Sequence, residues 1–133
     1  MNEGGMPSPY RAKSRLSAFR YAFSGWWYVL RTQRNAWIHL VATIMTVTLG
    51  LWLSLGSQDW AILLLAIGLV WTAEFINTGI EAIVDLASPE KHPLAQVGKD
   101  VGAATVLIAA LIAVLVGILI LGPPLFERVA LIF

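Results

Sequence analysis

The sequence predicts an all-α membrane protein with three transmembrane helices and an N-terminal amphipathic helix on the membrane surface. Of its 133 residues, 58% are hydrophobic and only 13% are charged, and the mean hydropathy is +0.74. These values lie outside the usual range of soluble globular domains. Three apolar stretches are each close to the roughly 20 residues that a helix needs to cross a bilayer core of about 30 Å. We therefore predict spans at residues 36–55, 60–85 and 99–121 of a single membrane domain covering residues 1–133.

The N-terminal part has two different sections. Residues 1–9 are rich in Gly, Pro, Ser and Asn, and we expect them to be disordered. Over residues 14–30, apolar side chains recur at helical spacing and are opposed by Arg15, Arg20 and Ser24. This pattern predicts an amphipathic helix on the cytoplasmic membrane surface. A helix packed on other protein gives the same pattern, and the two interpretations are compatible.

The distribution of charge predicts the topology. Six of the nine basic residues precede the first span, and the connection at residues 55–59 has none. Lys91 and Lys99 flank the second connection. By the positive-inside rule, the N-terminus and the loop at residues 86–98 face the cytoplasm, in a protein of the cell (inner or plasma) membrane. Because the chain has no cysteine, disulfides, thiolate metal sites and thiol nucleophiles are excluded.

The first and last spans carry few polar features. His39, near the inner end of the first span, is interpreted as an interface anchor or a neutral hydrogen-bonding group rather than a ligand. In the last span, Ala109, Ala113 and Gly117 form a ridge of small residues that permits close helix contact. The tail that follows, with its two prolines at 123–124, is expected to lie outside the span.

The middle span carries an acidic stripe formed by Glu74, Asn77, Glu81 and Asp85. At about 100° per residue, these four positions fall within about 80° of one another on one helix face. Carboxylates at membrane depth are costly, so they indicate a functional site. Because residues 35–90 contain no Lys or Arg, we predict that a divalent cation faces the stripe.

The members of the stripe lie at different depths. A span that starts near Trp60 reaches the inner membrane boundary near Ile80 after about 20 residues. Glu81 and Asp85 are then expected at or just beyond the headgroups, and Glu74 roughly 10 Å deeper. The same helix can thus present a base to a lipid hydroxyl and a metal ligand to the phosphates of a nucleotide that approaches from water.

This inventory is sufficient for phosphoryl transfer, which requires mainly positioning and charge stabilisation. Glu74 is the candidate general base, and Glu81 is the candidate Mg²⁺ ligand. Lys99, beside Asp100, is the candidate cation for the phosphates. Polar groups that only join helices are the structural alternative, and the excess of acids over nearby cations argues against it. The sequence has neither a Walker-type loop nor a kinase Gly-rich loop.

The segment from Glu74 to Asp85, with His92 seven residues further on and Lys99-Asp100 seven beyond, resembles the prokaryotic diacylglycerol kinase family, which includes the undecaprenol kinases. The likeness extends over roughly residues 14–121. The resemblance implies a homotrimer with active sites between neighbouring subunits and ATP as co-substrate. It implies that Glu74 is the catalytic base and Glu81 a metal ligand. It also implies that the nucleotide site contains Tyr21, Asn77, Asp85, His92, Lys99 and Asp100.

The chain departs from the family pattern at three places. The basic residue near the start of the surface helix is displaced, with Ser14 lying between Lys13 and Arg15. Gln33 stands where relatives often have a second metal-binding Glu, and Val97 stands where relatives carry an Arg. An amide still offers a carbonyl oxygen to Mg²⁺ but lacks the charge of a carboxylate. We therefore keep Gln33 with Glu81 as the predicted metal ligands.

The predicted function is ATP- and Mg²⁺-dependent phosphorylation of the hydroxyl of a membrane lipid alcohol. The acceptor is diacylglycerol, giving phosphatidic acid, or undecaprenol, giving undecaprenyl phosphate, and the sequence does not distinguish them. One alternative is a small proton- or cation-conducting protein, because acidic stripes also mark ion pathways. Another is a noncatalytic member of the family, suggested by Gln33 and Val97. No nucleic-acid partner is predicted.

Overall fold

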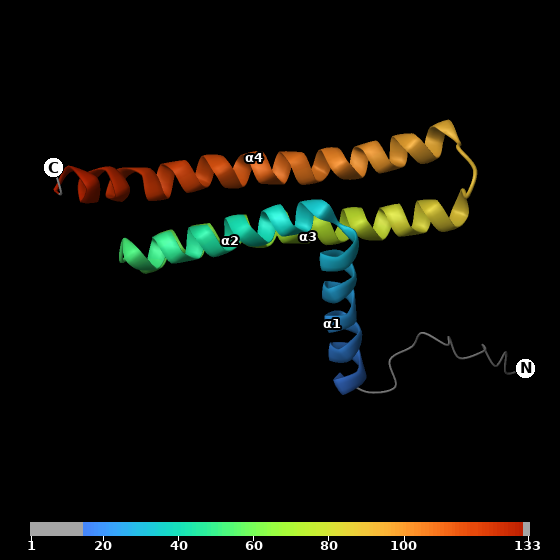
Figure 1. Ribbon diagram of the computed structural model, residues 1–133, viewed down its shortest axis with the longest axis horizontal. Coiled ribbons are helices and arrows are strands. Elements are labelled where there is room, and N and C mark those ends of the chain that lie inside the picture. Colours follow the sequence, from blue (N-terminus) through green and yellow to red (C-terminus); the bar gives the residue numbers. More distant parts are fainter. Residues whose placement is uncertain (1–14, 132–133) are drawn as a thin grey trace, which may run out of the picture.

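The computed structural model describes residues 15–131, which form four helices and no strand (Figure 1). The helices are α1 (Arg15–Thr32), α2 (Arg34–Trp52), α3 (Ser57–Ala87) and α4 (Pro93–Ala130). The predicted all-α class is confirmed, and α1 follows the surface helix predicted for residues 14–30 closely. The predicted disordered segment at residues 1–9 lies outside the described residues.

Three of these helices, α2, α3 and α4, are long and apolar enough to cross a membrane, as predicted. At 1.5 Å per residue, the 31 residues of α3 span about 46 Å and the 38 residues of α4 about 57 Å. Both lengths exceed the bilayer core of about 30 Å, so these two helices continue beyond the membrane. Their last and first turns extend past the junction of α1 and α2, where they form a helical hairpin (Figure 1).

The two ends of α4 differ from the expected span at residues 99–121. The helix begins six residues earlier because His92 caps it and Pro93 occupies its first turn, where proline is favoured. At the other end, it continues through Pro123 and Pro124, although each proline lacks the N–H of a helical hydrogen bond. The guanidinium of Arg128 lies 5.5 Å from the centre of the Trp52 ring, and this contact holds the last turns of α4 against the end of α2.

The core of the bundle lies along α3, which carries most of the buried side chains. Small residues line the contact between α3 and α4, so the two helices approach closely. Ala109 and Ala113 lie at this contact, as predicted for the ridge of small residues. Gly117, the third member of that ridge, has open space beside it. The α3–α4 cluster contains Val70, Ala73, Val106 and Ala109, with Ala113 packed against it.

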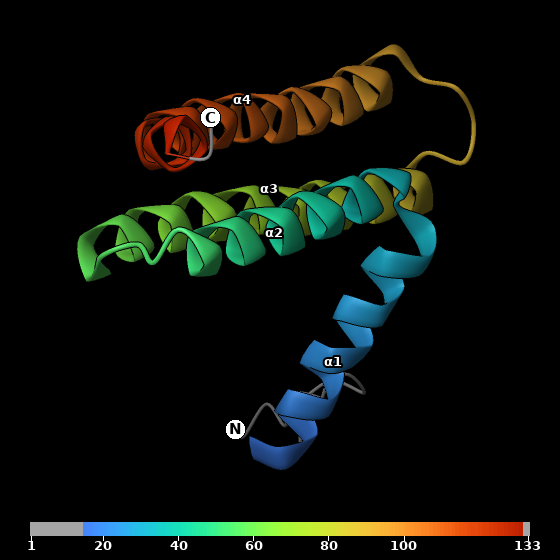
Figure 2. The same ribbon diagram turned by 60° about the vertical axis from the view of Figure 1, so that its left-hand side comes forward.

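A second cluster joins α1, α2 and α3. Trp26 of α1 packs its ring 4.9 Å from that of Trp71 and 4.6 Å from that of Phe75. From this contact, α1 turns away from the bundle (Figures 1 and 2). The first half of α1 exposes Phe19 and Phe23. One end of α1 therefore packs on protein, and the other end presents the aromatic face expected of a surface helix.

Candidate active site

The acidic stripe follows the last half of α3 and becomes more exposed toward the end of the helix. Glu74 is 1% exposed and Asn77 is 6% exposed, whereas Glu81 is partly buried and Asp85 is exposed. This gradient matches the predicted order of depth. The four residues therefore connect the inside of the bundle with the surface of the α3–α4 hairpin.

Glu81 is held by two amide groups. Its carboxylate accepts a hydrogen bond of 2.9 Å from Gln33 Nε2 and one of 3.0 Å from Asn77 Nδ2. Gln33 lies between α1 and α2 with extended backbone (φ −105°, ψ 115°), and its side chain does not cap α2. The side chain is therefore free to reach α3. The structure thus brings together the two predicted metal ligands, Glu81 and Gln33, from different helices.

Asn77 lies between Glu81 and α4. Its Oδ1 is buried and has no hydrogen-bond partner within residues 15–131. This atom lies directly against Gly102, and a Cβ at position 102 would overlap it. Gly102 therefore lets α4 pack on the amide. Gly102 is not among the site residues predicted from the sequence, although an isolated glycine inside a helical segment often has a packing reason.

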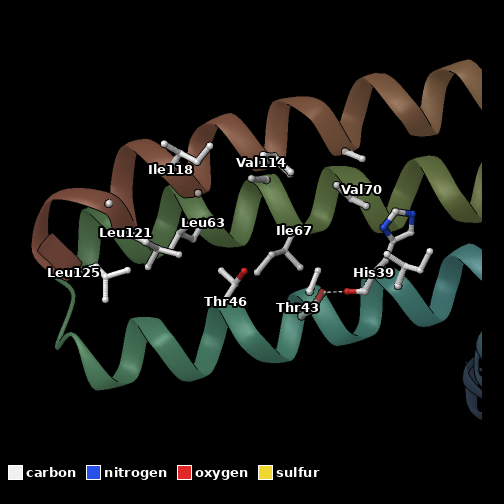
Figure 3. Close-up of a pocket in the computed structure, with 17 residues that line it drawn as sticks. His39, Thr43, Thr46, Leu63, Ile67, Val70, Val114, Ile118, Leu121 and Leu125 are labelled. Carbon is white, nitrogen blue, oxygen red and sulfur yellow. Dashed lines mark hydrogen bonds between the residues drawn. The ribbon is translucent and has the colours of Figure 1, made fainter. Parts of the chain in front are cut away.

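Glu74 is in contact with His39 of α2. The distance from His39 Nε2 to Glu74 Oε2 is 3.6 Å, and the two side chains are 12% and 1% exposed. Within the described chain, the two carboxylate oxygens of Glu74 have no hydrogen-bond partner, and His39 Nε2 has none either. Of the two interpretations of His39, the interface anchor is wrong, because the side chain is 12% exposed and its ring points into the bundle (Figure 3). That His39 is a neutral hydrogen-bonding group stays a prediction. Its i+3 spacing from the buried Ala36 places it on the face that α2 turns toward α3, a signal that is already present in the sequence.

Lys99 forms a salt bridge of 2.8 Å with Asp85, joining α4 to α3. Both line a surface depression of about 520 Å³ at the end of the hairpin, together with His92. His92 caps α4 by accepting a hydrogen bond of 3.2 Å from the Leu94 amide. Three of the predicted nucleotide-site residues thus share one depression.

Asp100 and Tyr21 do not line this depression. Asp100 is exposed and accepts a hydrogen bond of 2.7 Å from Gln96 within α4. Tyr21 is 56% exposed and belongs to the half of α1 that projects away from the bundle (Figure 1). A single chain therefore does not bring these two residues to Lys99.

The side chains present fit a metal ion that is shared with a substrate. Within the part of the chain that the structure describes, no three His, Cys, Asp or Glu side chains gather to hold a metal ion by themselves. Mg²⁺ usually takes one or two carboxylates and completes its shell with phosphates and water. The Glu81 carboxylate, next to the Gln33 amide, meets that smaller requirement.

An apolar groove of about 520 Å³ runs between α2, α3 and α4 and ends at His39 (Figure 3). Leu63, Leu121 and Leu125 lie at its other end. Its polar lining includes the hydroxyls of Thr43 and Thr46. His39 also contacts Glu74, which does not itself line the groove, so one end of the groove lies beside the residue that faces the buried carboxylate.

The fold and the site define a multi-pass membrane protein with its polar residues gathered at one end of the bundle. The sequence pattern of the prokaryotic diacylglycerol kinases matches residues 20–121. The chain therefore belongs to the prokaryotic diacylglycerol kinase family, and it is a lipid kinase. This confirms the family that the segment from Glu74 to Asp100 indicated.

Curated relatives agree with this assignment. The chain is 37% identical over 110 residues to the undecaprenol kinase of Bacillus subtilis (strain 168), covering 83% of this chain and 89% of the relative. It is 41% identical over 117 residues to the diacylglycerol kinase of Synechocystis sp., covering 87% and 67%. It is 35% identical over 95 residues to the diacylglycerol kinase of Escherichia coli (strain K12), covering 66% and 78%.

Proposed function

We propose that the chain transfers the γ-phosphate of ATP to the hydroxyl of a membrane lipid alcohol, with Mg²⁺ as cofactor and Glu74 as general base. One observation carries this proposal. Glu74 is 1% exposed at membrane depth, and within residues 15–131 both of its carboxylate oxygens have no hydrogen-bond partner. A buried polar group without a partner is costly, and an ionisable group inside a membrane indicates function. The hydroxyl of a lipid alcohol is the partner that this carboxylate lacks.

The reaction proceeds in one displacement. Glu74 takes the proton of the lipid hydroxyl while the lipid oxygen forms a bond to the γ-phosphorus. The bond between the γ-phosphorus and the bridging oxygen of the β-phosphate breaks, and ADP leaves with that electron pair. Glu74 ends the step protonated and must return its proton to water before the next lipid hydroxyl reacts.

Glu81 and Gln33 hold the metal in this proposal. In this structure, the Gln33 amide donates its N–H group to Glu81; it would hold Mg²⁺ through its carbonyl oxygen. When bound, Mg²⁺ neutralises charge on the phosphates. Lys99 supplies a second positive charge by exchanging Asp85 for a phosphate. The exchange costs little because an exposed pair of this kind contributes only about 0–1 kcal/mol.

The apolar groove holds the hydrocarbon tail of the lipid in this proposal. It is lined mainly by aliphatic side chains of three helices, and its inner end is His39, which contacts Glu74 (Figure 3). A lipid whose tail lies in the groove therefore brings its hydroxyl to the carboxylate. Groove length and width then decide between a diacylglycerol and a polyprenol.

We also propose that the active unit is a homotrimer in which a neighbouring subunit completes each site. In support, Tyr21 lies on a part of α1 that projects away from its own bundle, and Asn77 Oδ1 is buried without a partner among the described residues. Native mass spectrometry in detergent tests this directly. Three copies are expected, and a monomer with full activity would contradict the proposal.

The orientation is proposed from the basic residues: the N-terminus and the α3–α4 connection face the cytoplasm of the cell membrane. Because the chain has no cysteine, single introduced cysteines report sidedness. A cysteine at Ser57 is expected to react with an impermeant maleimide in intact cells, and one at Glu90 only after permeabilisation. The reverse pattern would overturn the orientation.

A side-by-side kinase assay tests the proposed function. The purified protein is supplied with γ-labelled ATP, Mg²⁺, and diacylglycerol or undecaprenol in mixed micelles. Label is expected in the lipid product of one or both alcohols, and none in the absence of lipid. A parallel proton-flux assay in liposomes covers the ion-conducting alternative. Flux without any lipid phosphorylation would overturn the proposal.

A further inference from the structure

We propose that His39 is a positioning residue for Glu74: its imidazole fixes the carboxylate in the orientation that takes the proton of the lipid hydroxyl. This inference depends on the proposed role of Glu74 as the base. Nothing in the resemblance assigned a role to His39, and the structure places it against the most deeply buried acid among residues 15–131.

The geometry of the pair carries the inference. His39 Nε2 lies 3.6 Å from Glu74 Oε2, with the two side chains 12% and 1% exposed. This separation is longer than a hydrogen bond, and such contacts often tighten only when the substrate binds. Within the described chain, His39 Nε2 and both Glu74 oxygens have no other partner. The polar atoms of the two side chains therefore have each other as their nearest available match.

The backbone of α2 at His39 is tied to α3, and the His39 ring packs against Trp71. Thr43 Oγ1 donates a hydrogen bond of 2.7 Å to the His39 carbonyl oxygen (Figure 3). Trp71 Nε1 in turn donates one of 3.1 Å to Thr43 Oγ1, and the edge of the His39 ring meets Trp71 with centroids 6.4 Å apart. These contacts tie α2 at His39 to α3 one turn before Glu74. A ring fixed in this way can fix the carboxylate that it faces.

Neither α3, which carries Glu74, nor α4 offers this carboxylate a comparable partner among residues 15–131. On α3, the next ionisable group is Glu81, two turns away and of like charge. On α4, the packed residues nearest this level are Gly102 and Val106, which do not ionise. No Lys or Arg of the described chain forms a salt bridge with Glu74. His39 is therefore the protein group placed to orient this carboxylate.

Two substitutions separate positioning from space filling. His39→Phe keeps a ring against Trp71 but removes the polar nitrogen, whereas His39→Gln keeps an N–H group at a similar reach. We expect kcat of the Phe variant to fall by about 10- to 100-fold, since misplacing a catalytic group costs up to about 10²-fold. The KM values for ATP and lipid are expected to change by less than about twofold, since the loss lies in the transition state. The Gln variant is expected to keep kcat within about threefold of wild type.

The double variant His39→Phe/Glu74→Gln tests whether His39 acts through Glu74. Because groups that act as a unit are not additive, the Phe substitution is expected to lower kcat no further once Glu74 is replaced. Thr48→Val is the matched control, since Thr48 lies on the same helix but is exposed and does not line the groove. The control is expected to keep wild-type kcat.

Three outcomes would overturn the inference: a Phe variant with wild-type kcat, a Gln variant as impaired as the Phe variant, or additive losses in the double variant. Thermal midpoints in detergent identify variants that fail to fold. If both His39 variants lose the fold, the pair serves stability and the positioning role is refuted. If the wild-type protein itself phosphorylates no lipid, the proposed function fails first, and the two failures are distinguished.

Discussion

Replacing Gly102 with Ala tests whether the Asn77 amide supports Glu81. A Cβ at position 102 would overlap Asn77 Oδ1, so either the amide turns or α4 moves outward. Asn77 is 6% exposed and therefore has little room to turn without breaking its 3.0 Å hydrogen bond to Glu81. We expect Gly102→Ala to release one of the two amide groups that hold the Glu81 carboxylate.

The magnitude follows from that hydrogen bond. Hydrogen bonds to charged groups contribute about 1.5–3 kcal/mol. Since every 1.4 kcal/mol corresponds to about tenfold, we expect kcat/KM for Mg·ATP to fall by about 10- to 150-fold. The assay is lipid phosphorylation at saturating lipid over a range of Mg²⁺ concentrations, and the titration is expected to shift to higher Mg²⁺.

Gly98→Ala is the matched control because it lies one turn earlier on α4. Its Cβ would meet Val84 Cγ2 at 3.7 Å, an ordinary contact. Both substitutions replace a helical glycine with alanine and gain a similar helix propensity, near 1 kcal/mol. A Gly102→Ala protein with the Mg²⁺ titration and kcat of the Gly98→Ala protein would refute the support role of Asn77.

Four further substitutions address the metal, the phosphates and the groove. Glu81→Ala is expected to raise the Mg²⁺ requirement steeply. Gln33→Glu is expected to lower it, because a second carboxylate strengthens binding of a divalent cation. Unchanged Mg²⁺ titrations would remove both residues from the metal site. Lys99→Met is expected to raise the KM for ATP severalfold while the thermal midpoint changes little, since an exposed ion pair contributes about 0–1 kcal/mol. An unchanged ATP KM would show that Lys99 serves only Asp85. Gly117→Leu is expected to raise the KM for the lipid but not for ATP, because a Cβ at Gly117 meets no heavy atom within 4 Å and the added side chain enters the groove. Gly68→Leu is the control. Gly68 is a helical glycine that also has no heavy atom within 4 Å of its added Cβ, and it does not line the groove. Both KM values are expected to stay unchanged in this variant.

The class of the fold could be predicted from the sequence because the length of an apolar run and its helical period are local properties. The ends of α3 and α4 could not. Both helices are longer than the bilayer core of about 30 Å, and the last turns of α4 are accompanied by contacts such as that of Arg128 with Trp52. Such contacts join residues far apart in the sequence.

The candidate site shows the same division. That Glu74, Asn77 and Glu81 share one face of a helix follows from periodicity alone. Their partners on other helices depend on how the helices are registered against one another, which periodicity does not contain. The pairing of Gln33 with Glu81 was expected only from the family resemblance. The contacts of His39 and Gly102 needed the structure.

The role of Glu74 as the base is tested most directly by Glu74→Gln, measured as single-turnover transfer of labelled γ-phosphate to the lipid. The amide keeps the shape of the side chain but cannot take a proton, so the rate is expected to fall by at least about 10²- to 10⁴-fold. Binding of a fluorescent ATP analogue and the thermal midpoint are expected to stay at wild-type values. A Glu74→Gln protein that phosphorylates lipid at the wild-type rate would contradict the account.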